Sequence, residues 1–294
     1  MDYLTSIIFF GFLYGILVAS LNLASGYTRF LSITHAGFFG IGAYAVAIMQ
    51  ADLHIAAPFA LIIALGITAV LALPVGLAVW RLSEEEFLLA TLAVGAITLA
   101  LMRNCESLTG GIMGKSAGAN LSILGPESNS RWLWCLVAAA MYALVHWFVR
   151  RLAGAPFGRA LVALGEDEIV IKSYGKNAGF LKLQAFILGS MLTAFAGFLI
   201  VEYVNYIEPS MFSLNESIFV LTIMIIGGLG SLWGGLAASM ALVWLPELLR
   251  FVGVPNGNAA NVRQIIFGTC LVVVIAVRWG AVQRRKNSPP PTAG

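Results

Sequence analysis

Residues Phe157–Gly175, FGRALVALGEDEIVIKSYG, form a charged island in a chain that is otherwise almost continuously apolar. Ionised side chains at this density do not lie in lipid. The island follows the helix-breaking pair Ala155-Pro156 and then mixes apolar and charged residues in the manner of an amphipathic helix. We therefore predict a short amphipathic helix between two membrane spans. Two interpretations of its polar side stay open, a solvated surface on the lipid headgroups and a docking element for a soluble partner.

The composition of the rest of the chain indicates the class of protein. Hydrophobic residues make up 60% of the 294 residues and charged residues 11%, and the mean hydropathy is +0.90. Because a membrane-spanning helix needs roughly 20 apolar residues, the sequence predicts an all-α, polytopic membrane protein with about eight or nine transmembrane or re-entrant helices. The predicted spans are 3–25, 31–50, 56–80, 86–103, 132–149, 180–203, a shorter pair at 217–231 and 233–249, and 263–279.

The positions of the basic residues predict how the chain is oriented. If 150–182 and the C-terminus are cytoplasmic, 12 of the 17 Lys and Arg residues lie inside and 5 lie outside. Basic residues in short loops favour the cytoplasm, so we expect the N-terminus outside and the C-terminus inside. The expected organisation is a transmembrane domain over 1–280, including a cytoplasmic region over 155–176, followed by a disordered cytoplasmic tail over 281–294.

Two segments are rich in glycine. Ser32–Met49 reads SITHAGFFGIGAYAVAIM, and Ile225–Met240 reads IIGGLGSLWGGLAASM. Glycine in a membrane helix allows close packing of neighbouring helices or a break whose freed backbone groups line a polar cavity. One such segment lies in each half of the chain, which favours an internal repeat over 1–130 and 131–294 with a translocation path between the halves.

Polar residues inside apolar runs are candidates for function because they are costly in lipid. They are Asn22, His35, Glu202, Glu216 and Glu247. The three glutamates either extend to the outer membrane surface or face a lumen. His35 has no second His or Cys at ligand spacing, so a helix-capping or interhelical hydrogen bond is expected in place of a metal site.

No motif in the sequence predicts catalysis. Thr109–Gly118, TGGIMGKSAG, resembles the end of a phosphate-binding loop, but that motif requires glycine where Thr109 stands and a strand before it. The cysteines Cys105, Cys135 and Cys270 lack metal-like spacing and are expected to pack among apolar residues. We expect no enzyme activity, metal or cofactor on this chain.

Three motifs resemble one transporter family. They are SLNLASGYTRFLSITHAGFFGIGAYAVAI (20–48), the charged island GRALVALGEDEIVIKSYG, and EPSMFSLNESIFVLTIMIIGGLGS (208–231). Together they resemble the LivM-type permeases of branched-chain amino acid ABC importers. The chain departs from the family where Arg29 replaces a usual glycine, where Ile33-Thr34 replaces Leu-Gly, and in the loop after Gly111. The loop departures concern the side that would face a binding protein.

The resemblance implies a half-channel of a heteromeric importer in the bacterial inner membrane. A second, LivH-like permease subunit, two ATPase subunits that carry ATP and Mg, and a periplasmic binding protein would be its partners, together with membrane lipid and without nucleic acid. Branched-chain amino acids are favoured as substrate, although the same framework serves urea, short amides and aromatic acids. The expected ATPase-docking residues are Arg159, Gly165, Glu166, Asp167, Glu168 and Lys172, with Gly165 forming a turn. The expected translocation path comprises Asn22, His35, Gly40, Gly42, Tyr44, Glu216, Gly227, Gly228 and Gly230.

Two alternatives belong to other classes. A secondary transporter or channel would keep the glycine-broken helices, but would usually show more ionisable residues at mid-span than this chain does. A membrane scaffold would account for the charged island but not for two glycine-broken segments. Dependence on ATP separates the importer from the first alternative, and any transport activity separates it from the second.

Overall fold

The computed structural model describes residues 2–80, 82–117, 131–251 and 269. The chain divides into two compact units, Met1–Val243 and Trp244–Gly294, and the first contains the contacts described below. The described helices are α1 (Asp2–Leu21), the π-helix η1 (Asn22–Gly26), α2 (His35–Ala51), α3 (Ala57–Val79), α4 (Glu84–Asn104), α5 (Glu106–Thr109), η2 (Gly111–Met113), α6 (Arg131–Gly154), α7 (Pro156–Glu166), α8 (Glu168–Ser173), α9 (Ala178–Val204), η4 (Pro209–Phe212), α10 (Leu214–Gly227) and α11 (Leu232–Phe251). Two short strands, β1 (Lys115–Ser116) and β2 (Tyr206–Ile207), pair antiparallel.

The described helices confirm the predicted class. Five are long and apolar enough to cross a membrane, namely α1 with η1, α3, α4, α6 and α9. Three apolar helices, α2, α10 and α11, are shorter, and the last two match the predicted pair of short runs. The predicted span 263–279, apart from residue 269, and the tail 281–294 lie outside the described residues. The internal repeat stays a prediction.

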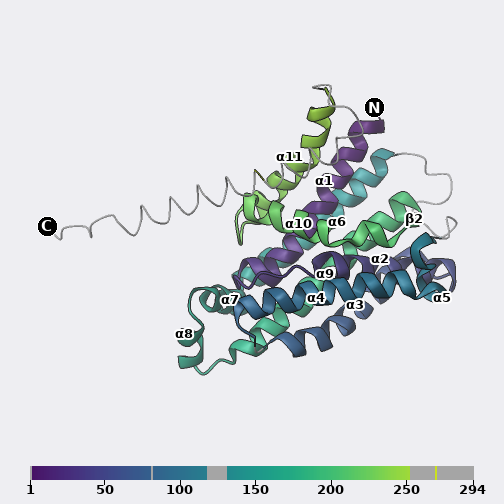
Figure 1. Ribbon diagram of the computed structural model, residues 1–294. Coiled ribbons are helices and arrows are strands. Elements are labelled where there is room, and N and C mark those ends of the chain that lie inside the picture. The colour runs from purple at the N-terminus through teal and green to yellow at the C-terminus, as the bar shows by residue number, and fades with distance from the viewer. Residues whose placement is uncertain (1, 81, 118–130, 252–268, 270–294) are drawn as a thin grey trace. The chain divides into compact units, whose positions relative to one another are not determined.

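Helix α9 forms the core of the first unit and packs against α1, α2 and α3 (Figure 1). The most apolar window of α9 is 72% buried, whereas that of α4 is 17% buried. An apolar helix face that other helices leave uncovered suits contact with lipid. Small residues bring α2 and α9 together, since a Cβ at Gly42 would lie 2.7 Å from Ala194 Cα, and one at Gly197 would lie 2.5 Å from the Ala43 nitrogen.

Contacts between loops place the connections between helices on two sides, as the predicted topology requires. On one side, called the β1 side, the β1–β2 pair joins the loop after α4 to the loop after α9, and Lys115 forms an ion pair of 2.6 Å with Asp52 after α2. On the other side, called the α7 side, α7 packs against the residues that follow η1. Which of these sides is cytoplasmic stays a prediction.

The charged island folds into two short helices at a corner. Pro156 opens α7 at a position where the missing backbone N–H costs nothing. Asp167 ends α7 and begins α8, because its Oδ1 accepts a hydrogen bond of 2.7 Å from the Ile169 amide. Apolar residues of α7 such as Leu161 and Leu164 are buried while Arg159 and Glu166 are exposed. The predicted amphipathic character is confirmed for α7, but the helix breaks at Asp167, and in α8 Ile169 is exposed while Ile171 is buried.

Candidate functional site

The first membrane helix ends in a π-helix, a rare form that often occurs at functional sites. All five residues of η1 are buried. Its first residue, Asn22, accepts a hydrogen bond at Oδ1 from the backbone N–H of Gly230, with the two atoms 2.8 Å apart. Gly26 lies so close to this contact that a Cβ there would be 2.2 Å from Asn22 Oδ1. Asn22 therefore joins the end of the first membrane helix to the second glycine-rich segment, 208 residues away along the chain.

The connection between α10 and α11 is a tight turn that depends on glycine. Gly228 has φ 99° and Gly230 has φ 77°, conformations that residues with a Cβ rarely adopt. At Gly227 an added Cβ would lie 2.5 Å from the Gly234 carbonyl oxygen. The ring of Tyr27 lies 3.5 Å from where a Cβ of Gly230 would stand. The predicted path residues Asn22, Gly227, Gly228 and Gly230 thus form one region, called the glycine turn.

The start of α2 is held by polar contacts to two other helices. Ser20 Oγ of α1 and His35 Nε2 are 2.7 Å apart, and both side chains are buried. The backbone N–H of Ala36 donates to Ser217 Oγ of α10 over 3.0 Å. The predicted interhelical hydrogen bond of His35 is therefore confirmed. Ser217 is not among the predicted site residues.

The predicted membrane glutamates differ in their surroundings. Tyr14 donates a hydrogen bond to Glu216. Glu202 is 3% exposed and accepts a hydrogen bond from Gln50 of α2, so it lies between α9 and α2 and does not extend to the surface. The side-chain surroundings of Glu247 lie outside what the structure describes.

Gly40, Gly42 and Tyr44 occupy packing positions in α2. A Cβ at Gly40 would lie 2.7 Å from the Phe212 ring, and the rings of Tyr44 and Phe212 are 5.9 Å apart. Together with the contact of Gly42 on α9, this shows glycine used for close approach of helices. Among the described residues, no hydrogen bond or ring contact joins this group to the glycine turn.

Several buried polar atoms near η1 and α2 have no hydrogen-bond partner within the described chain. They are Asn22 Nδ2, Ser25 Oγ, Ser32 Oγ, Thr34 Oγ1 and the Tyr44 hydroxyl. Buried polar groups are nearly always paired, so each of these unpaired atoms requires an explanation. Such atoms suit hydrogen bonds with a polar solute, with water in a path, or with a second subunit.

Helices α7 and α8 are called the charged helix pair, and α7 packs directly against the backbone that follows η1. A Cβ at Gly165 would lie 2.6 Å from the Tyr27 carbonyl oxygen and 3.0 Å from the Thr28 carbonyl oxygen. Gly165 lies inside α7, so the expected turn at this residue is wrong, because the α-helix continues to Glu166. Its role is close approach of α7 to the backbone at Tyr27 and Thr28.

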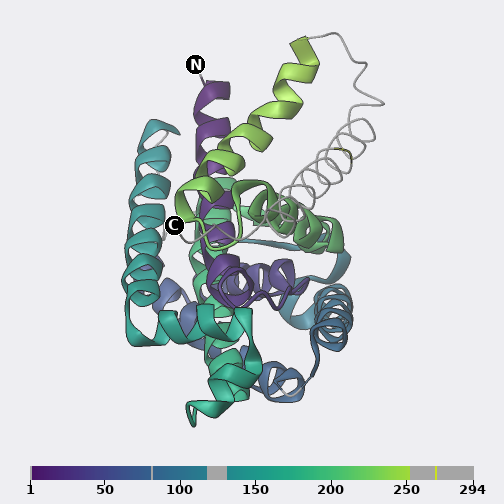
Figure 2. The same ribbon diagram turned by 90° about the vertical axis from the view of Figure 1, so that its left-hand side faces the viewer.

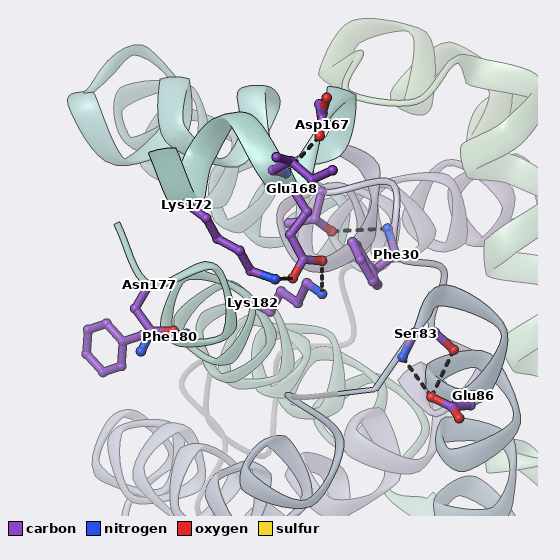
Figure 3. A network of polar contacts seen from close by, with 11 residues as sticks. Phe30, Ser83, Glu86, Asp167, Glu168, Lys172, Asn177, Phe180 and Lys182 are labelled. Carbon is purple, nitrogen blue, oxygen red and sulfur yellow. Dashed lines mark hydrogen bonds and ion pairs between the residues drawn. The ribbon is translucent and has the colours of Figure 1, made fainter. Parts of the chain in front are cut away.

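An ion-pair network ties α8 to α9. Glu168 accepts from Lys182 at 2.8 Å and from Lys172 at 2.9 Å, and the Lys182 ammonium lies 3.7 Å from the centre of the Phe30 ring (Figure 3). The hydrogen bond from Lys182 is the main cause that lowers the pKa of Glu168, and Lys172 adds to it. A lowered pKa keeps a carboxyl ionised to pH values below its ordinary pKa of 4.5, so Glu168 is a carboxylate at neutral pH.

Lys182 is not among the predicted site residues, although it decides the surroundings of Glu168. It is 6% exposed, and an ammonium group that deep requires a partner. A lysine in the long apolar run after residue 178 is the signal in the sequence that could have indicated it. The other predicted docking residues, Arg159, Glu166 and Lys172, are exposed.

The Glu168–Lys182 pair gives a prediction about stability. Glu168→Gln is expected to destabilise the protein by about 1–3 kcal/mol, because Lys182 stays buried without a charged acceptor. The double variant Glu168→Gln/Lys182→Met is expected to recover most of this loss, since no unpaired charge stays behind. Thermal unfolding in detergent at pH 7 measures both. Equal unfolding temperatures for the single variant and wild type would contradict the role of the pair.

Arg29, which replaces the usual glycine of the family motif, has φ 59° and an exposed side chain. Left-handed backbone costs a residue with a Cβ about 1–2 kcal/mol. The departure thus occurs at a position whose conformation favours glycine. Arg29→Gly is expected to raise the unfolding temperature, with a gain of about 1 kcal/mol. Arg29→Ala is the control, because it removes the charge and keeps the Cβ. An equal gain in both variants would assign the effect to charge.

The structure therefore defines a multi-pass helical membrane protein with a charged helix pair seated against a glycine-dependent region. The family described as "Branched-chain amino acid transport system / permease component" matches residues 3–275. The chain belongs to this family, as the motifs predicted.

Similar proteins agree with this assignment. The chain is 31% identical over 261 residues to the high-affinity branched-chain amino acid transport system permease protein LivM of Salmonella typhimurium, covering 81% of this chain and 61% of that protein. LivM of Escherichia coli is 30% identical over 262 residues, with the same coverage of 81% and 61%. A probable LivM of Methanocaldococcus jannaschii is 26% identical over 221 residues, covering 72% of this chain and 64% of that protein. The chain thus spans less than two thirds of these relatives. No solved structure gives a significant match.

Proposed function

We propose that this chain is the transmembrane permease subunit of an ATP-driven importer for branched-chain amino acids or related small polar solutes. The contact of Gly165 in α7 with the backbone at Tyr27 and Thr28 carries the proposal. It connects a charged, exposed helix pair to the glycine turn through a few packed residues. The printed names of the LivM relatives support the transport role and the substrate class.

Energy would enter through α7 and α8. ATP closes two ATPase subunits, and the resulting rigid-body movement pushes on the helix pair. Because Gly165 leaves no space between α7 and residues 27–28, a movement of α7 displaces them. These residues continue from η1, where Asn22 holds the Gly230 amide. The movement therefore reaches the α10–α11 turn.

The unpaired polar atoms near η1 and α2 would contact the solute. A zwitterionic amino acid needs hydrogen-bonding groups on its way, but tight binding would trap it. Single hydroxyls such as those of Ser25, Ser32 and Thr34 offer weak contacts of this kind. A second, LivH-like permease subunit would complete the path, since one chain supplies only one half of it.

The remaining partners follow from the same assignment. The α7 side would be cytoplasmic and hold the two ATPase subunits with ATP and Mg, with the C-terminus on the same side of the bacterial inner membrane. The β1 side would receive a periplasmic binding protein. That protein would choose among branched-chain amino acids, urea, amides and aromatic acids.

Affinity purification of this chain from its own membrane in mild detergent tests the assembly. Recovery of a second permease and two ATPase chains is expected. Proteoliposomes that contain this assembly, with the binding protein added outside, should take up leucine only when ATP is enclosed on the side of the ATPase subunits. Recovery of this chain alone, with uptake driven by an ion gradient, would replace the proposal with a secondary transporter.

Glu166 offers a test of the docking surface. It is exposed, and within the described chain it forms no ion pair. Glu166→Lys is expected to lower ATP-driven uptake and the amount of co-purified ATPase by about tenfold, because reversed charge disfavours the same partner. Glu85→Lys, an exposed charge at the start of α4, is the control. Asp167 is a poorer choice because it caps α8. Unchanged ATPase recovery in Glu166→Lys would exclude Glu166 from the interface.

A further inference from the structure

A cavity lies at the α7-side end of α6, outside the regions discussed so far. It has a volume of about 880 Å³ and is lined by the last turns of α6 and the corner that leads into α7. Figure 2 shows α6 as the teal helix at the edge of the described bundle, with α7 turning away from its lower end. Pockets that enclose small ligands have volumes of roughly 300–1,000 Å³. The volume falls within that range, but the described lining residues all belong to one stretch of chain, 147–156, so the cavity is an open recess in the surface.

The cavity combines apolar walls with basic residues. Trp147, Phe148, Leu152 and Pro156 form apolar walls, and Arg150 and Arg151 lie among them. Both arginines are exposed, and neither forms an ion pair within the described chain. Tryptophan and arginine at the end of a membrane helix lie at the level of the lipid headgroups. Guanidinium groups bind phosphate through paired hydrogen bonds.

The surface around the cavity indicates the bound group. Trp147 is 64% exposed, and Leu144 and Leu136 on the same helix are 52% and 66% exposed. This apolar face continues from the cavity toward the β1 side, as the acyl chains of a lipid would. A soluble anion would use the arginines but not the apolar walls, whereas an anionic lipid would use both.

We propose that this cavity binds an anionic phospholipid, with the phosphate at Arg150 and Arg151 and the acyl chains against Trp147 and the exposed face of α6. The site lies where α6 meets α7. A bound lipid would hold that corner at the membrane surface. The proposal rests on the membrane class of the protein and not on its transport substrate.

Two variants separate charge from shape. Arg150→Gln/Arg151→Gln removes the charges and keeps the cavity. Gly154→Leu adds an apolar side chain that narrows the cavity and keeps the charges, because Gly154 lines the cavity and a Cβ there meets nothing within 4 Å. Arg29→Gln/Lys176→Gln is the control, since it removes two exposed basic residues elsewhere in the chain.

Native mass spectrometry of the purified chain, titrated with phosphatidylglycerol, measures binding. Phosphatidylcholine with the same acyl chains is the neutral reference. We expect phosphatidylglycerol to bind about tenfold more tightly than phosphatidylcholine, and both cavity variants to lose most of this preference while the control keeps it. Thermal unfolding without added lipid establishes that each variant is folded.

Any of the following results would overturn the proposal. One is equal binding of the two lipids by the wild-type chain. Another is full preference for phosphatidylglycerol in both cavity variants, or an equal loss in the control, which would assign binding to net charge. The third is displacement of phosphatidylglycerol by millimolar inorganic phosphate, which would indicate a site for a soluble anion.

Discussion

Replacing Gly165 with alanine is expected to lower ATP-driven uptake by about tenfold or more, which corresponds to about 1.4 kcal/mol or more in the barrier of the limiting step. The added methyl carbon would stand 2.6 Å from the Tyr27 carbonyl oxygen. That atom belongs to the backbone, so the clash is relieved only if α7 moves away from residues 27–28. If α7 loses this contact with residues 27–28, its movement no longer displaces η1.

The ordinary effect of this substitution acts in the opposite direction. Alanine stabilises a helix relative to glycine by about 1 kcal/mol. Gly66 of α3 is the matched control, since an added Cβ there meets nothing within 4 Å, and Gly66→Ala should keep full uptake. ATP hydrolysis by the assembled complex should persist in Gly165→Ala while uptake falls. Wild-type uptake in this variant would remove α7 from the route of coupling.

Replacing Gly230 with valine is expected to reduce uptake to background while the chain still inserts in the membrane. Gly230 has φ 77°, which is least accessible to a β-branched residue and costs about 1–3 kcal/mol. The same residue donates its N–H to Asn22, so a turn that relaxes to another conformation also loses this contact. The two effects act together on the glycine turn.

Leu229→Val is the matched control for this substitution. It introduces the same β-branched side chain one residue earlier, at a position that is 40% exposed and has an ordinary φ. Uptake into proteoliposomes and the yield of folded chain in detergent should be measured for both variants. Normal uptake by Gly230→Val, with folded protein in normal yield, would exclude the turn from the transport cycle.

These two predictions concern opposite ends of one route. Gly165 receives the movement of the charged helix pair, and Gly230 lies where the movement arrives. The route between them consists of residues 27–28 and η1, whose first residue, Asn22, accepts the hydrogen bond from Gly230. If the route is continuous, Asn22→Leu should lower ATP-driven uptake as both of these variants do, because the Gly230 amide would then lack its acceptor.

The sequence by itself determined the class of protein and the positions of most helices. Apolar runs of sufficient length require helices in a membrane, since no other structure except a closed barrel satisfies the backbone there. The charged island and the break at Ala155-Pro156 predicted α7, and the motifs predicted the family. These features depend on composition and short-range spacing, which are readable along the chain.

Only the tertiary structure decided what the individual residues do. Glycine looks the same in sequence whether it packs against a helix, as Gly42 does on α9, or allows a positive φ, as at Gly228 and Gly230. Glu168 and Lys182 are 14 residues apart, and nothing in their spacing predicts that they pair. The Asn22–Gly230 contact joins residues 208 positions apart. Such contacts arise when helices pack, so their partners become known only once the helices are placed.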